Sequence, residues 1–98
     1  MKTITVIIRA RPGTEQTMRE ALLKVAAHVR ANEPHTIGFH ISQDASDPCV
    51  FTTYERFADE AAMDRHNGSA AVAAFFETAN PIMDGEIVFH TCNEISTK

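Results

Sequence analysis

The chain has 98 residues, of which 44% are hydrophobic and 22% charged, and its formal net charge is −4. This length accommodates a single domain, residues 1–98, with the composition of a globular rather than a disordered protein. The negative charge gives no electrostatic basis for binding nucleic acid or an anionic membrane, and no apolar run approaches the ~20 residues that span a bilayer.

The first residues and the cysteines bear on the cellular compartment. The opening MKTITVIIRARPG alternates like a strand and lacks a small-residue cleavage site, so no secretory signal is predicted. Cys49 and Cys92 stand alone, without the spacing of a zinc site or a disulfide framework. We therefore expect a cytoplasmic protein without a bound metal.

The first half of the chain predicts a strand, a helix and a hairpin. Residues 3–10 (TITVIIRA) are rich in β-branched side chains and end at a Pro-Gly pair. A long amphipathic helix follows, with Thr14 at its N-cap position and its end near Glu33. Residues 36–43 and 49–56 predict two strands joined by the turn DASDP.

The second half predicts two short helices and a last strand. Asp59 can cap a helix that runs through His66, and Ser69 starts another stretch of helical periodicity that Pro81 ends. Residues 85–94 predict the last strand. The order β-α-β-β-α-β is typical of the ferredoxin-like α+β fold, in which a four-stranded antiparallel sheet carries its helices on one face.

The pattern of apolar residues in the strands predicts a homodimer. The segments TVII (residues 5–8) and EIVF (residues 86–89) are apolar on both faces, which is the pattern of strands buried on both sides. The helices cover only one face, so a second copy of the chain is expected to cover the other and form a homodimer. The alternative is one apolar face that stays partly exposed.

Residues 33–76 resemble the antibiotic biosynthesis monooxygenase (ABM) family of the dimeric α+β barrel superfamily. Members typically read Glu-Pro-Gly, an alternating strand with an aromatic residue, Asp-x-x-Asp-Pro, Glu-x-Trp-x-Asp and a histidine seven residues later. The matching positions here are Glu33, Pro34, Phe39, Asp44, Asp47, Pro48, Glu55, Phe57, Asp59, Met63 and His66. The RPG sequence before the long helix also fits.

The resemblance implies a homodimer whose sheets pack face to face, with a pocket between sheet and helices in each subunit. Relatives include cofactor-free oxygenases of polyphenols and quinols, haem-degrading enzymes and an isomerase. This chain has no tryptophan, Phe57 stands where many members have one, and His35 replaces the usual glycine. Haem-degrading relatives carry an asparagine on the first strand, where Val6 is nearest here, so haem degradation is disfavoured.

His66 has three possible roles: a helix-end cap, a buried core histidine, or a proton-transfer group beside a ligand. It shares a helix face with Ala62 and Met63, which should pack toward the sheet. A histidine in a last turn also interacts favourably with the helix dipole. The residues alone favour the cap, and the family resemblance favours the pocket role.

Aromatic side chains could form the rest of a pocket. Tyr54 is the only tyrosine and could hydrogen-bond a phenolic or carbonyl substrate, although a core tyrosine is as good an interpretation. The expected substrate-binding residues are Phe39, Phe57, Met63, Phe75 and Phe76. An ordinary core without a cavity is the alternative for this set.

The other histidines show no metal-ligand spacing, and His40 and His90 are expected on opposite edges of the sheet. Glu55 is interpreted as a residue at the end of the sheet that forms a salt bridge or a cap. The first hypothesis is therefore a cofactor-independent monooxygenase of a small phenol- or quinol-type aromatic substrate, with His66 and Tyr54 as catalytic residues. The second is a small-molecule-binding protein or an isomerase of the same superfamily without oxygenase activity.

Overall fold

The computed structural model describes residues 1–98 and contains the predicted elements in the predicted order. They are β1 (Lys2–Arg9), α1 (Glu15–Asn32), β2 (Thr36–Gln43), β3 (Val50–Phe57), α2 (Glu60–Asn67), α3 (Ala70–Ala79), a 3-10 turn η1 (Asn80–Ile82) and β4 (Val88–Asn93). The strands lie in the order β2-β3-β1-β4, and every neighbouring pair is antiparallel. The predicted ferredoxin-like α+β fold is thus confirmed.

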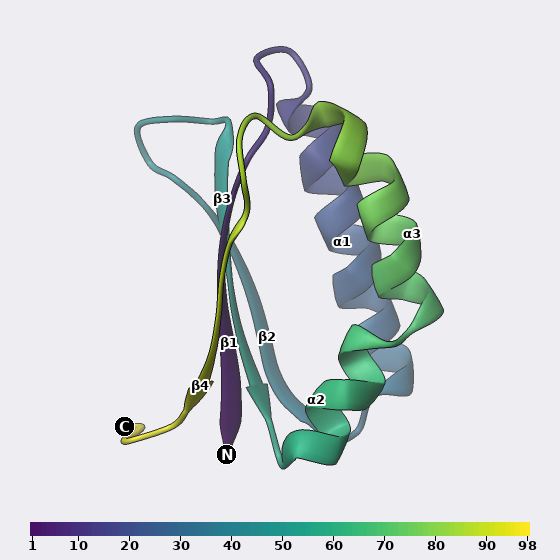
Figure 1. The fold of residues 1–98 in the computed structure, drawn as a ribbon, viewed down its shortest axis with the longest axis vertical. Coiled ribbons are helices and arrows are strands. Elements are labelled where there is room, and N and C mark those ends of the chain that lie inside the picture. Colours follow the sequence, from purple (N-terminus) through teal and green to yellow (C-terminus); the bar gives the residue numbers. More distant parts are fainter.

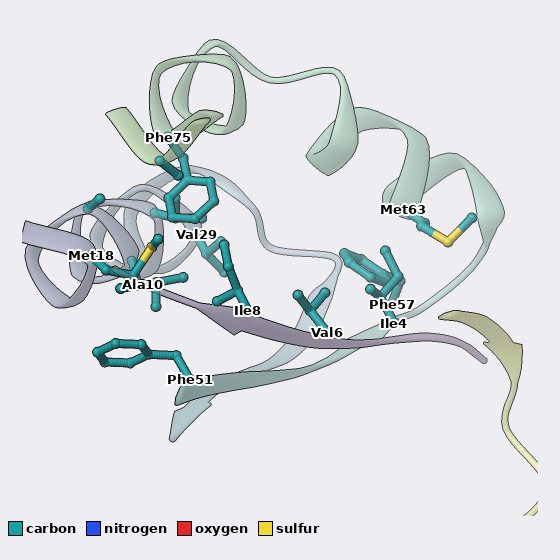
Figure 2. Packing of buried hydrophobic residues seen from close by; sticks show 14 of the residues in the cluster. Ile4, Val6, Ile8, Ala10, Met18, Val29, Phe51, Phe57, Met63 and Phe75 are labelled. Carbon is teal, nitrogen blue, oxygen red and sulfur yellow. The ribbon is translucent and has the colours of Figure 1, made fainter. Parts of the chain in front are cut away.

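All the helices lie on one face of the sheet, and the other face is free of them (Figure 1). The core fills the space between the sheet and the helices. Ile4, Val6 and Ile8 of the central strand β1 pack there against apolar side chains of the helices, such as Met18 and Phe75 (Figure 2). Burial of each such side chain contributes roughly 1.5–3 kcal/mol, which makes this layer the main source of stability. No helix combines the length and the apolar character that crossing a membrane requires.

Two capped helices meet at the corner that positions the site. Asp59 accepts a hydrogen bond from the backbone N–H of Ala62 at 2.8 Å, and Ser69 accepts one from Val72 at 3.2 Å, as predicted. Between the helices, a Cβ on Gly68 would lie 3.2 Å from the carbonyl oxygen of Asp64, so the close turn favours glycine. The corner fixes the last turn of α2 against the sheet.

The first helix differs from the prediction at its N-terminus. Thr14 occupies the N-cap position, but its side chain makes no capping bond to the helix. Its hydroxyl instead donates to the carbonyl oxygen of Arg11 at 2.6 Å. The threonine therefore stabilises the turn before the helix rather than the helix end.

The helix-free face is less apolar than the sequence pattern indicates. Alternation along β1 directs Thr5 and Ile7 to this face, so only one of these two outward residues is apolar. Three large apolar or aromatic side chains are exposed on it: Ile7, Tyr54 and Val88. The prediction of strands that are apolar on both faces is therefore only partly correct.

The edge strand β2 also departs from simple alternation. The pairing of β2 with β3 shifts register between Thr36 and Gly38, so Ile37 is 49% exposed. Beyond the irregularity, Phe39 and Ile41 pack against the core as expected. Simple alternation predicts Ile37 on the same face as these two residues, and the bulge is the reason that it is not there.

Candidate active site

An apolar cavity of about 60 Å³ lies between the sheet and the helices. The sheet contributes inward-facing residues of β1, β2 and β4, namely Val6, Ile8, Phe39 and Phe89. The helices contribute Leu22 and Val25 of α1 and Val72, Phe75 and Phe76 of α3. The wall is thus largely hydrophobic, and it suits an apolar ligand better than a charged one.

The mouth of the cavity lies where its lining is least buried. Phe89 is 46% exposed, Asn67 at the end of α2 is also exposed, and Val72, Phe76 and Ile87 are half-buried. The volume is well below that of an engineered cavity of about 150 Å³ that accepts benzene. A substrate ring therefore requires side chains at the mouth to move outward.

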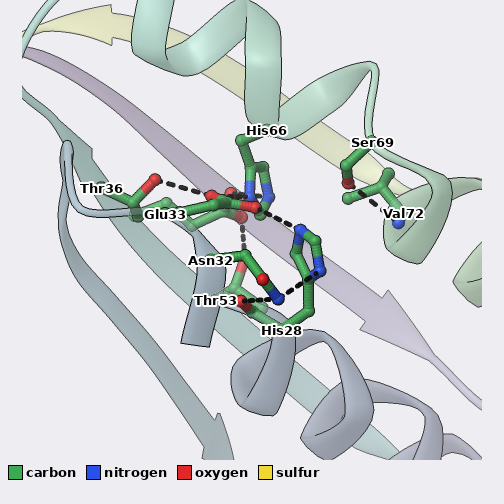
Figure 3. A network of polar contacts seen from close by, with 9 residues as sticks. His28, Asn32, Glu33, Thr36, Thr53, His66, Ser69 and Val72 are labelled. Atoms are coloured by element: carbon green, nitrogen blue, oxygen red, sulfur yellow. Dashed lines mark hydrogen bonds and ion pairs between the residues drawn. The ribbon is translucent and has the colours of Figure 1, made fainter. Parts of the chain in front are cut away.

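Thr53, Glu55 and His66 form the polar part of the cavity wall. His66 Nδ1 lies 2.9 Å from Oε1 of Glu33 (Figure 3). The other ring nitrogen, Nε2, lies 3.2 Å from Oε1 of Glu55. His66 is 3% exposed and Glu55 is 5% exposed. One buried imidazole thus bridges two carboxylates, and only Glu55 of the two acids lines the cavity.

Each carboxylate has a further partner. The hydroxyl of Thr53 donates to Oε2 of Glu55 at 2.7 Å, and that of Thr36 donates to Oε1 of Glu33 at 2.7 Å. His28 Nε2 lies 3.1 Å from Oε2 of Glu33, an ion-pair distance whose direction does not make a hydrogen bond. Burying these charges is tolerable because each carboxylate lies at ion-pair distance from a histidine and accepts at least one hydrogen bond.

The two acids set the charge of the histidine. Burial alone would lower the pKa of His66, but the hydrogen bonds and negative charges of Glu55 and Glu33 outweigh burial and raise this pKa above its ordinary value. The imidazolium form therefore persists to higher pH than in a free histidine. A histidine in this state gives up a proton or stabilises a nearby anion more readily than it accepts a proton.

Two aromatic rings hold the imidazole in place. The ring centroid of Phe39 lies 5.5 Å from that of His66, and the centroid of Phe57 lies 5.3 Å from it, both tilted by about 50°. Neither ring nitrogen bonds a carbonyl of its own helix end, since both face carboxylates. His66 is therefore a buried core histidine at the cavity wall and not a helix-end cap.

The structure brings together part of the predicted site. Phe39, Phe75 and Phe76 line the cavity. Phe57 and Met63 are buried in the core and do not line it, although Phe57 packs on His66. Phe57 thus supports His66 from behind, and Met63 belongs to the surrounding core.

Tyr54 is not at this site. It alternates with Thr53 and Glu55 along β3, and since these face the helices, Tyr54 faces the helix-free side. There it is 41% exposed and stacks on His40, with ring centroids 6.3 Å apart. The sheet itself separates its hydroxyl from the cavity. The prediction that Tyr54 and His66 belong to one catalytic site is therefore corrected: within one chain, the alternation of β3 directs them to opposite sides of the sheet.

The sequence interpretation missed the two acids that hold His66. The sequence predicts Glu55 as a residue at the end of the sheet that forms a salt bridge or a cap, yet the alternation of β3 places it on the same buried face as Phe51 and Phe57. An acid on the buried face of a strand requires a partner, and His66 is the inward-facing base of α2. That pattern could have identified the pair, whereas no local pattern links Glu33 to His66, 33 positions later.

The sequence model of the family "Antibiotic biosynthesis monooxygenase" matches residues 1–78. A Caulobacter crescentus protein named for these monooxygenases has a similar structure, with a TM-score of 0.89 and 21% identity over 97% of this chain and 90% of that one. A Nitrosomonas europaea protein named in the same way gives a TM-score of 0.88 at 21% identity, over 98% of this chain and 100% of its own. A Mycobacterium tuberculosis protein gives 0.89 at 14% identity, over 98% and 96%. These identities establish the fold alone, and a search of curated proteins found no match.

Proposed function

Because this chain belongs to the antibiotic biosynthesis monooxygenase family, we propose that it is a monooxygenase that oxidises a small phenol- or quinol-type aromatic substrate without a cofactor. The single observation that carries this proposal is the Glu55–His66 pair in the wall of an otherwise apolar cavity. Such a pair can move a proton beside a ring that is shielded from water.

Glu55 is the proton acceptor in this proposal. Its Oε1 lies 3.2 Å from Nε2 of His66, and its Oε2 accepts a hydrogen bond from Thr53. These contacts leave free lone pairs on a carboxylate that has about four acceptor positions. The raised pKa of His66 makes the imidazole a poor base and a good source of positive charge. Glu55 therefore takes the phenolic proton, and the His66 imidazolium stabilises the phenolate and the peroxide that follows.

The reaction balances without an external reductant. The phenolate transfers electrons to O₂ one at a time, and a ring carbon forms a bond to oxygen, giving a peroxide anion. This anion regains the proton that Glu55 had removed. Loss of the ring C–H proton with cleavage of the O–O bond then yields a quinone and water, so that phenol plus O₂ becomes quinone plus water.

A second candidate function is that of an isomerase, and the arrangement around His66 favours it specifically. A histidine with a carboxylate at each ring nitrogen can give a proton on one side and regain one on the other. That chemistry moves a proton within a substrate and consumes no oxygen.

The proposal includes a homodimer. Members of this family are typically dimeric, and the exposed Ile7, Tyr54 and Val88 on the helix-free face offer apolar area for a second sheet. Packing of two such faces would also bury the stacked His40 and Tyr54. The cavity opens on the other side of the sheet, so each subunit would keep its own site.

Oxygen uptake with a panel of phenols and quinols tests the proposal, with no cofactor added and a metal chelator present. Glu55→Gln should reduce the rate by about 10²–10⁴-fold, the usual contribution of a positioned proton-transfer group. Glu60→Gln is the matched control, because Glu60 is an exposed acid on the adjacent helix and should keep the wild-type rate. Substrate conversion without oxygen consumption would support the isomerase instead.

A further inference from the structure

A second hollow lies on the other side of the Glu33–His66 contact. It is a polar cleft of about 380 Å³, open to solvent, and His28, Asn32, Glu33, His35 and Arg65 are among its lining residues. Glu33 thus faces this cleft and also holds Nδ1 of His66, whose imidazole lines the apolar cavity. The two hollows share a wall made of ionisable side chains.

The contacts in this wall form a continuous chain. Oε1 of Glu55 lies 3.2 Å from Nε2 of His66. On the other side of the ring, Nδ1 of His66 lies 2.9 Å from Oε1 of Glu33, and Oε2 of Glu33 lies 3.1 Å from Nε2 of His28 (Figure 3). The His28 side chain is 28% exposed, whereas that of His66 is only 4% exposed. The chain therefore runs from a buried cavity wall to a group in contact with solvent.

The outer end has a defined orientation. The side-chain amide nitrogen of Asn32 lies 3.3 Å from Nδ1 of His28, and an amide N–H can only donate. Neutral His28 therefore carries its proton on Nε2, the nitrogen that faces Glu33. The oxygens of Glu33 are divided between the rings, Oε1 toward His66 and Oε2 toward His28.

We propose that Glu55, His66, Glu33 and His28 form a proton relay between the apolar cavity and the polar cleft, with His28 as the solvent-side end. A proton from the cleft adds to Nδ1 of His28, and the imidazolium so formed gives its Nε2 proton to Oε2 of Glu33. The carboxyl group of Glu33 then turns by half a rotation about its Cγ–Cδ bond and gives this proton to Nδ1 of a neutral His66. The reverse sequence carries a proton from His66 to the cleft. This inference rests on the proposed function, in which the Glu55–His66 pair moves a proton at the cavity wall.

The cavity mouth is a poorer route for the same proton. Val72, Phe76, Ile87 and Phe89 are the partly exposed residues there, and none of them carries a titratable group. Asn67 is the polar residue at this opening, and its side-chain amide does not take up or release a proton as a titratable group does. A bound aromatic ring would also fill this mouth, whereas the cleft beside His28 would remain open to water.

The test follows the ring N–H protons of His66 by nitrogen-15 NMR in protein labelled at histidine, and measures their exchange with water in the absence of substrate. His28→Gln should slow this exchange by at least about tenfold, a conservative value for loss of a positioned proton-transfer group. His35→Gln is the matched control, because His35 lines the same cleft without a hydrogen bond or ion pair from its ring. It should leave the exchange rate unchanged.

A second variant separates the relay from a change in structure. His28→Ala places the best helix former at this position of α1. The substitution also enlarges the cleft, which then has room for free imidazole. Added imidazole should restore the exchange rate in His28→Ala and leave the wild type unaffected. Equal exchange in wild type and His28→Gln, equal slowing in His35→Gln, or failure of imidazole to restore exchange would each overturn the relay.

These measurements separate the relay from the proposed function. Slowed exchange in His28→Gln with no oxygen uptake by the wild type would leave the relay standing and reject the oxygenase. Oxygen uptake by the wild type with unaltered exchange in His28→Gln would reject the relay and retain the oxygenase.

Discussion

Replacement of His66 by alanine is the most informative perturbation of the fold. The change removes the only partner that Glu33 and Glu55 share, and leaves two buried carboxylates without their central positive charge. Removing one member of a buried ion pair typically costs about 3–5 kcal/mol. The space left between the rings of Phe39 and Phe57 adds to the loss, because packing there cannot fully relax.

The loss of about 3–5 kcal/mol is a large share of the roughly 5–15 kcal/mol by which a typical protein is stable. Urea denaturation followed by circular dichroism at pH 7 measures it. Arg65→Ala is the matched control, since Arg65 lies one position earlier in the last turn of α2 and is exposed, and its change should stay within about 0.5 kcal/mol. Adding Glu55→Gln to His66→Ala should recover part of the loss, because an amide carries no buried charge.

A loss of only about 0.5–2 kcal/mol in His66→Ala would refute this reasoning, because that is the cost of a missing helix cap. If Glu55→Gln recovered none of the stability lost in His66→Ala, the buried charge of Glu55 would not be the cause of the loss.

The pH dependence, the second helix and the helix-free face each give a further prediction. The raised pKa of His66 contributes stability that is complete below the unfolded-state pKa near 6.5 and is lost as pH rises through the folded-state pKa. The urea midpoint of the wild type should therefore decrease as pH rises between these two pKa values, and that of His66→Gln should change less. Parallel curves for the two proteins would contradict this. Asp59→Ala should lower stability by about 0.5–2 kcal/mol in thermal unfolding, because it removes the cap on Ala62, and an unchanged midpoint would deny that role. Thr5→Glu places a charge in the middle of the helix-free face and should convert a dimer to monomers in light scattering, whereas a single-chain mass for the wild type at micromolar concentration would remove the dimer.

The elements were predictable because their signals are local. The β-branched run of β1, the caps Asp59 and Ser69, and the alternation of β3 each act within a few residues. These signals give the element order, and the order restricts the topology to few choices. The bulge that exposes Ile37 was not predictable, since it depends on how β2 pairs with β3.

The site was predictable only in part, because its decisive contacts are distant in the sequence. Periodicity placed His66 on the inward face of α2 and Phe75 on that of α3, and both line the cavity. The bridge from His66 to Glu33 joins the end of α1 to the end of α2, and no sequence spacing encodes it. The position of Tyr54 could have been predicted from alternation along β3, because its side chain lies on the same face of the sheet as Thr52 and on the opposite face from Glu55.

The central claim is that the cavity of this protein inserts one atom of O₂ into an aromatic substrate. Turnover under ¹⁸O₂ with the best phenol or quinol of the panel, followed by mass spectrometry of the product, tests it most directly. The account predicts a quinone with a single oxygen atom from ¹⁸O₂, and no label from solvent in the matching reaction in H₂¹⁸O. A product without oxygen from ¹⁸O₂, or an isomer of the substrate formed equally well without oxygen, would contradict it.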